Sequence, residues 1–365
     1  MSLYRFLIIL SILVWGLTSC APAPGAQVTA AVATEVSTAV GSPTPASETS
    51  GDDILGKLVI YSGRSEALIQ PVIDAFKTKH PHVEILLKAG SNSELANALL
   101  EEAANPVADV FITTELFTVQ SLAMQDVFQS YLPAEADQLP PELIGPNQTW
   151  IGLTRRARVI MYNSELVSAQ EAPKSIFELM DAKWKGQIAA AGTTNGSMQA
   201  QIAAMRQLLG EQATEEWLKG LLANDVTFFG GHTDVRKAVG SGEFKIGLVN
   251  HYYFYLQQAE GSPVGVVFPD QGEGEIGLIT NATAAGIVKG AHNLAAAQAF
   301  MDFLISPEGQ NLFAELNYEY PLRAGVPLRQ GVQPLDGFRL AAVDVVKAAL
   351  DFEATFDLME RVGLP

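Results

Sequence analysis

Cysteine is almost absent from this chain: its 365 residues contain a single one, Cys20. A lone cysteine excludes an internal disulfide, and with Cys20 set aside for the reason below, the fold has no thiolate chemistry. Zinc-site spacing, a P-loop and a Ser/His/Asp set are missing too, so we predict that the protein is not an enzyme. Basic residues are also scarce: 23 Lys and Arg face 40 Asp and Glu, giving a net charge of −17. This balance opposes nucleic acid as a partner.

Long apolar runs are missing after the N-terminus. The first twenty residues, MSLYRFLIILSILVWGLTSC, combine one basic residue with an apolar run too short to span a bilayer. We therefore predict a signal peptide over 1–19. Leu17–Cys20 resembles a bacterial lipobox, which implies cleavage before Cys20 and a lipid on its thiol. The alternative is an ordinary secretory signal with an incidental cysteine. Residues 20–55, rich in Ala, Thr, Ser and Pro, read as a low-complexity tether.

The rest of the chain alternates extended and helical patterns. Apolar, β-branched runs predict buried strands, while spacings of three and four residues predict amphipathic helices. This alternation favours an α/β fold with parallel strands. In the first helix, apolar residues fall from Leu68 to Phe76, and Pro71 fits best near its first turn. The strands are expected at 57–63, 83–90, 108–114, 150–163, 245–250 and 276–290, and the helices at 68–76, 94–105, 175–184, 198–210, 215–224, 293–306 and 307–316.

Two adjacent tyrosines, Tyr252 and Tyr253, follow the predicted strand 245–250 and open a helix. Ligands of α/β sheets bind outside the carboxyl ends of strands. A helix start carries partial positive charge, which favours a phenolate over a phenol. The pair is therefore a candidate ligand site. An aromatic cluster packed between lobes is the alternative, and it suits the following Phe254 and Tyr255 better.

The body of the chain resembles periplasmic ferric-iron-binding proteins, the solute-binding subunits of iron(III) ABC importers. The resemblance covers about residues 57–328, and the residues Asn-x-Tyr-Tyr after a strand are its specific signal. The matching pieces occur in order: Ile60-Tyr61-Ser62-Gly63-Arg64, Ala108-Asp109-Val110-Phe111, Arg156-Ala157-Arg158-Val159, Trp184-Lys185-Gly186, Asn250-His251-Tyr252-Tyr253, Ser306-Pro307-Glu308-Gly309-Gln310 and Glu319-Tyr320-Pro321-Leu322-Arg323.

This resemblance implies a two-lobe, type II periplasmic-binding-protein fold with two crossover strands and a ligand cleft between the lobes. We expect the N-terminal lobe at 56–155 and 281–322, and the C-terminal lobe at 156–280 and 323–365. The expected function is capture of iron(III) and its delivery to an ABC permease. The protein would be a monomer outside the cytoplasm, held at a bacterial membrane by its lipid anchor alone.

The resemblance also implies the ligands. Tyr252 and Tyr253 would bind the iron, with Tyr61 as a further candidate. Many family members add a His and a Glu, but those positions hold Ser65 and Thr114 here. Another subgroup uses tyrosines with a carbonate-type anion, and this sequence looks most like that subgroup. We therefore expect Fe(3+) together with carbonate or bicarbonate.

Such an anion needs its own binding residues. Arg64 follows the first strand and Arg156 sits at the expected crossover, and a planar guanidinium suits a bidentate oxyanion. Asn195, Gly196 and Ser197 stand at a helix start, which is an anion-binding geometry. Asn250 is the last candidate. The alternatives are structural ion pairs for the two arginines, plain capping for the Asn-Gly-Ser turn and strand termination for Asn250.

Other interpretations stay open at this point. The same fold could bind an anionic organic solute, a phosphonate or a carboxylate, directly through the arginines and the helix start. A redox metalloenzyme fits poorly, because two phenolates favour iron(III) and no His-rich facial triad is present. His232 corresponds to a position near the family's anion site, although a solvated turn is the simpler interpretation. His251 adjoins the tyrosines, but its ring can point away from the cleft.

Overall fold

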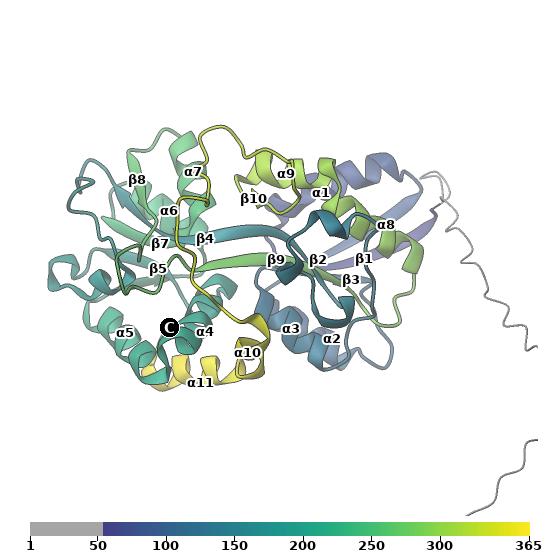
Figure 1. Cartoon of the computed structure of the whole chain (residues 1–365), viewed down its shortest axis with the longest axis horizontal. Coiled ribbons are helices and arrows are strands. Elements are labelled where there is room, and N and C mark those ends of the chain that lie inside the picture. Colours follow the sequence, from purple (N-terminus) through teal and green to yellow (C-terminus); the bar gives the residue numbers. More distant parts are fainter. Residues whose placement is uncertain (1–53) are drawn as a thin grey trace, which may run out of the picture. The chain divides into compact units, whose positions relative to one another are not determined.

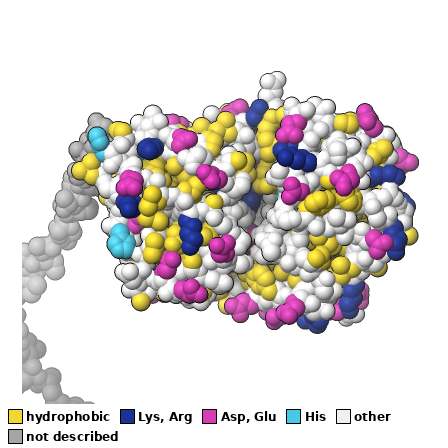
Figure 2. Space-filling model, turned by 180° about the vertical axis from the view of Figure 1, so that it is seen from behind, with side chains coloured by type: hydrophobic (Ala, Val, Ile, Leu, Met, Phe, Trp, Pro, Cys, Tyr) yellow, Lys and Arg dark blue, Asp and Glu magenta, His cyan; other side chains and the backbone are white. Residues whose placement is uncertain are grey.

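The computed structural model describes residues 54–365, and these form one compact unit (Figure 1). The predicted signal peptide, the lipidation site Cys20 and the tether up to Asp53 lie outside the described residues. Within residues 54–365, no helix is both long enough and apolar enough to cross a membrane. Figure 2 shows acidic and basic side chains interspersed over one face, so the net negative charge does not form a single patch there.

Ten strands form one continuous network in the order β2-β1-β3-β9-β4-β7-β5-β6, while β8 and β10 both pair with β4. The pairs β1–β2, β1–β3, β5–β6 and β5–β7 are parallel, as the strand–helix alternation predicted. The strands are β1 Gly56–Ser62, β2 Val83–Ala89, β3 Val110–Thr113, β4 Ile151–Asn163, β5 Ile188–Ala191, β6 Thr227–Phe229, β7 Ile246–Asn250, β8 Val264–Val267, β9 Thr280–Ile287 and β10 Tyr320–Pro321.

Two antiparallel strands, β4 and β9, run across the middle of the molecule (Figure 1). The first part of β4, Ile151 to Ala157, pairs with β9, and the second part, Arg158 to Asn163, pairs with β7 and β8. The far end of β9 pairs with β3. These are the two predicted crossover strands, and they bring Arg156 and Arg158 to the centre of the fold.

Helices cover both sides of the strands (Figure 1). Several of them begin directly after a strand, so that their N-termini gather near the centre. The helices are α1 Glu66–Lys79, α2 Asn92–Glu101, α3 Leu116–Met124, α4 Gly196–Leu209, α5 Glu211–Ala223, α6 His232–Gly240, α7 His251–Ala259, α8 Leu294–Ile305, α9 Pro307–Asn317, α10 Val345–Leu350 and α11 Glu353–Val362.

Two helix predictions are wrong in detail. Helix α1 begins one turn early, because Leu68 and Ile69 both donate backbone hydrogen bonds to Ser65, and this puts Pro71 inside the helix. The segment predicted as a helix over 175–184 forms two 3₁₀ turns, Ile176–Met180 and Ala182–Trp184. Its carbonyls are taken by side chains instead, since the Trp217 indole and the Asn224 amide both donate to this segment. Tertiary contacts thus override the local helix propensity.

The buried apolar side chains form several cores rather than one. The largest core combines residues of 54–153 with residues of 282–322. Two others are built mainly from 157–279 and from the C-terminal segment, including Leu358 and Met359 of α11. This arrangement is that of two α/β lobes joined by β4 and β9. The lobe boundaries predicted from the sequence stay a prediction.

Candidate metal and anion site

A cavity of about 240 Å³ lies between the two lobes where five helices begin. The N-cap residues of α1, α2, α4 and α6, which are Ser65, Ser91, Asn195 and Gly231, all line it, and the first turn of α7 adds two tyrosines. Helix N-termini carry partial positive charge and free N–H groups, so their convergence favours bound negative charge.

The cavity has two sides, named here the first wall and the second wall. The first wall is formed by Gly63, Arg64, Ser65, Leu68, Ser91, Asn92 and Thr114. The second wall is formed by Arg156, Thr194, Asn195, Gly196, Ser197, Gly231, His232, Thr233, Tyr252 and Tyr253. Of the residues singled out from the sequence, the structure thus brings together Arg64, Arg156, Asn195, Gly196, Ser197, Tyr252 and Tyr253.

Tyr252 and Tyr253 lie in the first turn of α7 with their ring centroids 4.3 Å apart. Strand β7 ends at Asn250, so the backbone delivers both phenols to the cavity at the point where the helix begins. Burial raises the pKa of Tyr253 well above its ordinary value, and the neighbouring Tyr252 raises it further. The charges of Arg156 and Arg64 act in the opposite direction. Tyr253 is therefore protonated at neutral pH, and a bound cation would have to displace that proton.

The Arg64 guanidinium forms an ion pair with a carboxylate. Its Nη2 donates to Glu319 at 2.6 Å, and its Nη1 donates to Glu319 at 3.1 Å and to the Thr283 hydroxyl at 2.9 Å. Glu319 also accepts a hydrogen bond from the Thr154 hydroxyl. Burial would raise the pKa of Glu319, but the charge and hydrogen bonds of Arg64 outweigh it and hold that pKa below its ordinary value. The structural ion pair is therefore what the geometry favours for Arg64, with only Nε left without a partner.

Arg156, unlike Arg64, is not paired with a carboxylate. It is buried, it lines the cavity, and its Nε and Nη2 have no hydrogen-bond partner. No ion pair involves Arg156 within residues 54–365. A buried guanidinium without partners is costly unless a ligand supplies them. Arg156 is thus the cation of this cavity that is free to meet an anion.

The Asn-Gly-Ser turn mainly serves its own helix. The Asn195 side chain caps α4 by accepting from the backbone N–H groups of Ser197 and Met198 at 3.1 and 3.3 Å. Gly196 is required by close packing, because a Cβ there would lie 2.7 Å from the Asn92 amide nitrogen of the first wall. The turn therefore combines helix capping with a position at the cavity, and the two interpretations from the sequence do not exclude each other.

Two predicted site residues do not line the cavity. Tyr61 points away along β1, where its hydroxyl donates to the Glu102 carboxylate at 3.0 Å. Burial and then Glu102 raise the pKa of Tyr61 to about 12. Asn250 lies behind the cavity, where it accepts from Arg158 and donates to the Ser197 hydroxyl at 3.0 Å. Tyr61 is therefore left out of the ligand set proposed below, and Asn250 supports the second wall instead of contacting an anion.

The first wall offers no strong metal ligand. Ser65 and Thr114, for which the resemblance implied a His and a Glu in other family members, both line the cavity. Glu115, one residue further on, caps α3 by accepting from the backbone of Phe117 at 2.6 Å and of Thr118. Within residues 54–365, no group of three or more His, Cys, Asp and Glu side chains could hold a metal ion. Any metal in this cavity would have to rely on the phenols and on added ligands.

Three buried side chains, Arg158, His232 and Glu319, were given no site role from the sequence. Arg158 lies two residues after Arg156 on β4. Side chains two apart lie on the same face of a strand, so this spacing is a signal that could have identified Arg158. His232 is buried and lines the cavity, so the solvated turn is the wrong interpretation. Glu319 is 255 residues away from Arg64, a pairing that no local pattern predicts.

His251 is a structural residue. Its Nδ1 accepts from the Ala157 backbone at 3.2 Å and its Nε2 lies 3.0 Å from the Tyr318 carbonyl, while its ring stacks on Tyr320. Burial lowers the pKa of His251 to about 3, so the ring is neutral. It links β4 to the segment around Tyr318 and does not line the cavity, as the sequence interpretation allowed.

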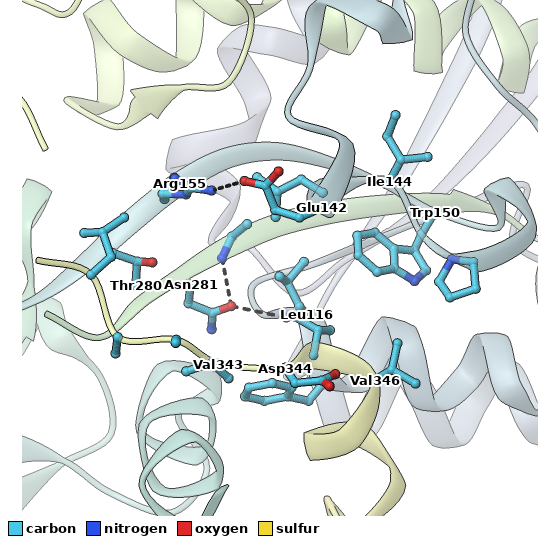
Figure 3. A pocket seen from close by; sticks show the side chains of 18 residues that line it. Leu116, Glu142, Ile144, Trp150, Arg155, Thr280, Asn281, Val343, Asp344 and Val346 are labelled. Carbon is cyan, nitrogen blue, oxygen red and sulfur yellow. Dashed lines mark hydrogen bonds and ion pairs between the residues drawn. The ribbon is translucent and has the colours of Figure 1, made fainter. Parts of the chain in front are cut away.

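A second, larger cavity of about 560 Å³ lies beside the crossover strands (Figure 3). Arg155 and Glu142 form an ion pair of 3.1 Å at its edge, and Asn281 accepts from the Leu116 backbone. Apolar side chains such as Trp150 provide much of the remaining wall. None of the candidate site residues lines it, so its size does not make it the functional site.

The comparisons with known proteins agree with this geometry. Residues 105–335 match the family of bacterial extracellular solute-binding proteins. The chain belongs to this family. Iron uptake protein A1 of Synechocystis is 32% identical over 332 residues, which cover 87% of this chain and 90% of that protein.

Two solved structures extend the comparison. Iron-bound HitA from Pseudomonas aeruginosa has a TM-score of 0.78 at 28% identity, covering 84% of this chain and 99% of that one. The Trichodesmium protein IdiA (FutA), in complex with iron and citrate, has a TM-score of 0.69 at 32% identity, covering 85% of this chain and 100% of that one. The resemblance to ferric-iron-binding proteins and the type II two-lobe fold are thereby confirmed.

Proposed function

We propose that this solute-binding protein captures iron(III) in the cavity between its lobes. Tyr252 and Tyr253 act as phenolate ligands, and an anion held by Arg156 completes the coordination shell. Cysteine and carboxylate side chains are missing from the cavity lining, so the phenols are its only source of anionic protein oxygen. Iron(III) is a hard cation, and a bound metal ion releases the phenolic protons. The iron uptake protein and the two iron-bound structures among the named relatives support the choice of metal.

One observation carries this proposal: the positive charges in the second wall and directly behind it are unbalanced. Arg156 and Arg158 are both buried, and neither forms an ion pair within residues 54–365, whereas Arg64 is neutralised by Glu319. Two phenolates would balance these two arginines. The charge of a trivalent ion would then remain, and an added oxyanion would offset part of it. We propose carbonate or bicarbonate as that anion, in contact with Arg156 and with the N-terminus of α4.

The wider role follows from the family. We propose that the protein works outside the cytoplasm, attached by a lipid on Cys20, and passes its iron to the permease of an ABC importer. The two lobes would close over the ion about β4 and β9, the strands that connect them. In this proposal no residue performs chemistry on the cargo, and the protein acts as a monomer.

The test is the visible absorption of the purified protein, with and without iron(III), in bicarbonate buffer. Phenolate-to-iron charge transfer should colour the loaded protein, and Tyr252→Phe combined with Tyr253→Phe should abolish the colour. Tyr255→Phe is the matched control, because Tyr255 lies on the same helix, does not line the cavity and accepts a hydrogen bond from the Gln333 backbone. A colourless wild type that cannot compete with a chelator for iron(III) would overturn the proposal. It would favour an anionic organic solute bound directly by Arg156.

A further inference from the structure

Arg158 is a buried cation surrounded by neutral acceptors. It is 3% exposed, and its Nε donates to Gln201 at 2.8 Å while its Nη1 donates to Asn250 at 3.0 Å. The same Nη1 lies 3.1 Å from Nε2 of His232, which lines the cavity. Burying an unpaired guanidinium is expensive, so this position calls for a role beyond packing.

The contact with Arg158 fixes the tautomer of His232. A guanidinium has only N–H donors and no acceptor, so Nε2 of His232 must be the acceptor and cannot carry a proton. The ring proton of a neutral imidazole then sits on Nδ1.

A ring in this state is a poor metal ligand. Metal coordination needs a free lone pair on nitrogen, but the lone pair of Nε2 is engaged by Arg158 and Nδ1 carries the proton. The N–H on Nδ1 is then the only ring hydrogen that His232 can donate to an oxygen, and His232 lines the cavity. The ring meets Tyr253 edge-on with 5.1 Å between centroids, so a metal on the phenols would lie near it.

We propose that Arg158 determines the metal selectivity of the cavity by keeping His232 a hydrogen-bond donor and not a ligand. Divalent zinc, copper and nickel favour imidazole nitrogen. His232 is the only imidazole among the residues that line the cavity, which include no Cys, Asp or Glu. With this ring withheld, the second wall presents oxygen ligands alone. The inference rests on the proposed function only in that the cavity takes a metal ion.

The experiment uses the iron-free protein, so it does not depend on iron binding. Nitrogen-15 spectra of labelled histidine should show His232 of the wild type with a protonated Nδ1 and an unprotonated Nε2. Zinc titration by calorimetry then compares the wild type with Arg158→Met. Removing the guanidinium allows the ring proton to move to Nε2 and leaves the Nδ1 lone pair free, so zinc affinity should rise by about 10–100-fold, the usual effect of a group that acts on a metal ligand. Adding His232→Asn to Arg158→Met should remove this gain.

Arg236→Met is the matched control, because Arg236 is a buried arginine on the same helix as His232 but donates to Gln257 and Glu260. It should leave zinc affinity unchanged. A proton on Nε2 in the wild type would overturn the inference without any variant. So would an unchanged zinc affinity in a folded Arg158→Met, or in Arg158→Gln should the first variant fail to fold. A protein that passes these tests and yet binds no iron(III) refutes the proposed function and leaves the role of Arg158 standing.

Discussion

The two walls of the cavity satisfy their polar groups in different ways. In the first wall, Arg64 is paired with Glu319, and the Asn92 amide donates to Thr114 and to the helix-capping Glu115. In the second wall, Arg156 has unpartnered N–H groups and two phenols lie side by side, and behind this wall Arg158 has no carboxylate partner. Apart from Arg64 Nε, these first-wall groups are therefore satisfied without a ligand, while those of the second wall are not.

This difference separates stability from binding. Buried groups that satisfy one another stabilise the fold, whereas buried groups left without partners are stabilised only when a ligand supplies them. We infer that the second wall provides the binding free energy and that the first wall closes over the bound ion. Substitutions in the first wall should then change stability, and substitutions in the second should change affinity.

The largest effect is expected for Tyr252→Phe combined with Tyr253→Phe. Two unit charges 4 Å apart interact by about 4 kcal/mol at an effective dielectric of 20, and two phenolates face a trivalent ion. Even after the cost of deprotonation, iron affinity should fall on the order of 10⁴-fold or more, at about 1.4 kcal/mol per factor of ten. Competition with citrate measures the loss. Retention of iron within tenfold of the wild type would mean that other residues bind the metal.

Glu319→Gln should act on stability. Breaking a buried ion pair costs about 3–5 kcal/mol, because Arg64 is left as an uncompensated charge. Denaturant unfolding should show this loss, while Glu308→Gln, in an exposed pair with Lys79, should change stability by less than about 1 kcal/mol. A variant of normal stability with weakened iron binding would show that Glu319 contributes to the binding site and not to the stability of the fold.

The same carboxylate makes a pH prediction. The folded-state pKa of Glu319 lies below its ordinary value of 4.5. The contribution of Glu319 to the free energy of unfolding is therefore fully present above pH 4.5, its ordinary pKa, and disappears as the pH falls through its lower folded-state pKa. The wild type should lose stability relative to Glu319→Gln as the pH is lowered below about 4.5, and unfolding curves at pH 7, 5 and 3.5 measure the difference. Parallel curves for the two proteins across this range would show that the carboxylate is not ionised in the fold.

Arg156→Gln should weaken iron binding only when an anion is present. A charge-assisted hydrogen bond contributes about 1.5–3 kcal/mol, so the loss in bicarbonate buffer should be roughly 10–100-fold. In carbonate-free buffer the variant and the wild type should bind equally weakly. Arg155→Gln is the control, since Arg155 pairs with Glu142 and lines the other cavity. Wild-type affinity that ignores bicarbonate would show that the protein completes the coordination shell itself.

The sequence predicted well what depends on local pattern. Strand–helix alternation predicted the α/β fold, and the step from β7 to α7 predicted that Tyr252 and Tyr253 would open a helix at a cavity. The sequence did not predict the contacts between residues that lie far apart in the chain. The Trp217 indole donates to a carbonyl of the segment that the sequence assigned to a helix, and Glu319 neutralises Arg64, one of the two arginines expected to bind the anion. Such pairs leave no periodic signal in one sequence.

The smallest effect is expected for Ser65→His, which tests the comparison of the two walls by adding a possible metal ligand to the first wall. Ser65 lines the first wall and caps α1 without a side-chain hydrogen bond, so its replacement removes no cap. An imidazole there would offer iron a nitrogen ligand from the first wall. Because Arg64 and Glu319 already neutralise each other, the new ligand would meet no free charge on that wall. Iron affinity should rise by about tenfold, near 1.4 kcal/mol, and its dependence on bicarbonate should weaken. Titration in both buffers measures this, with Ser65→Asn as the control of similar polarity. An unchanged affinity in both buffers would mean that the closed first wall does not reach the ion, and that closure serves only to exclude water.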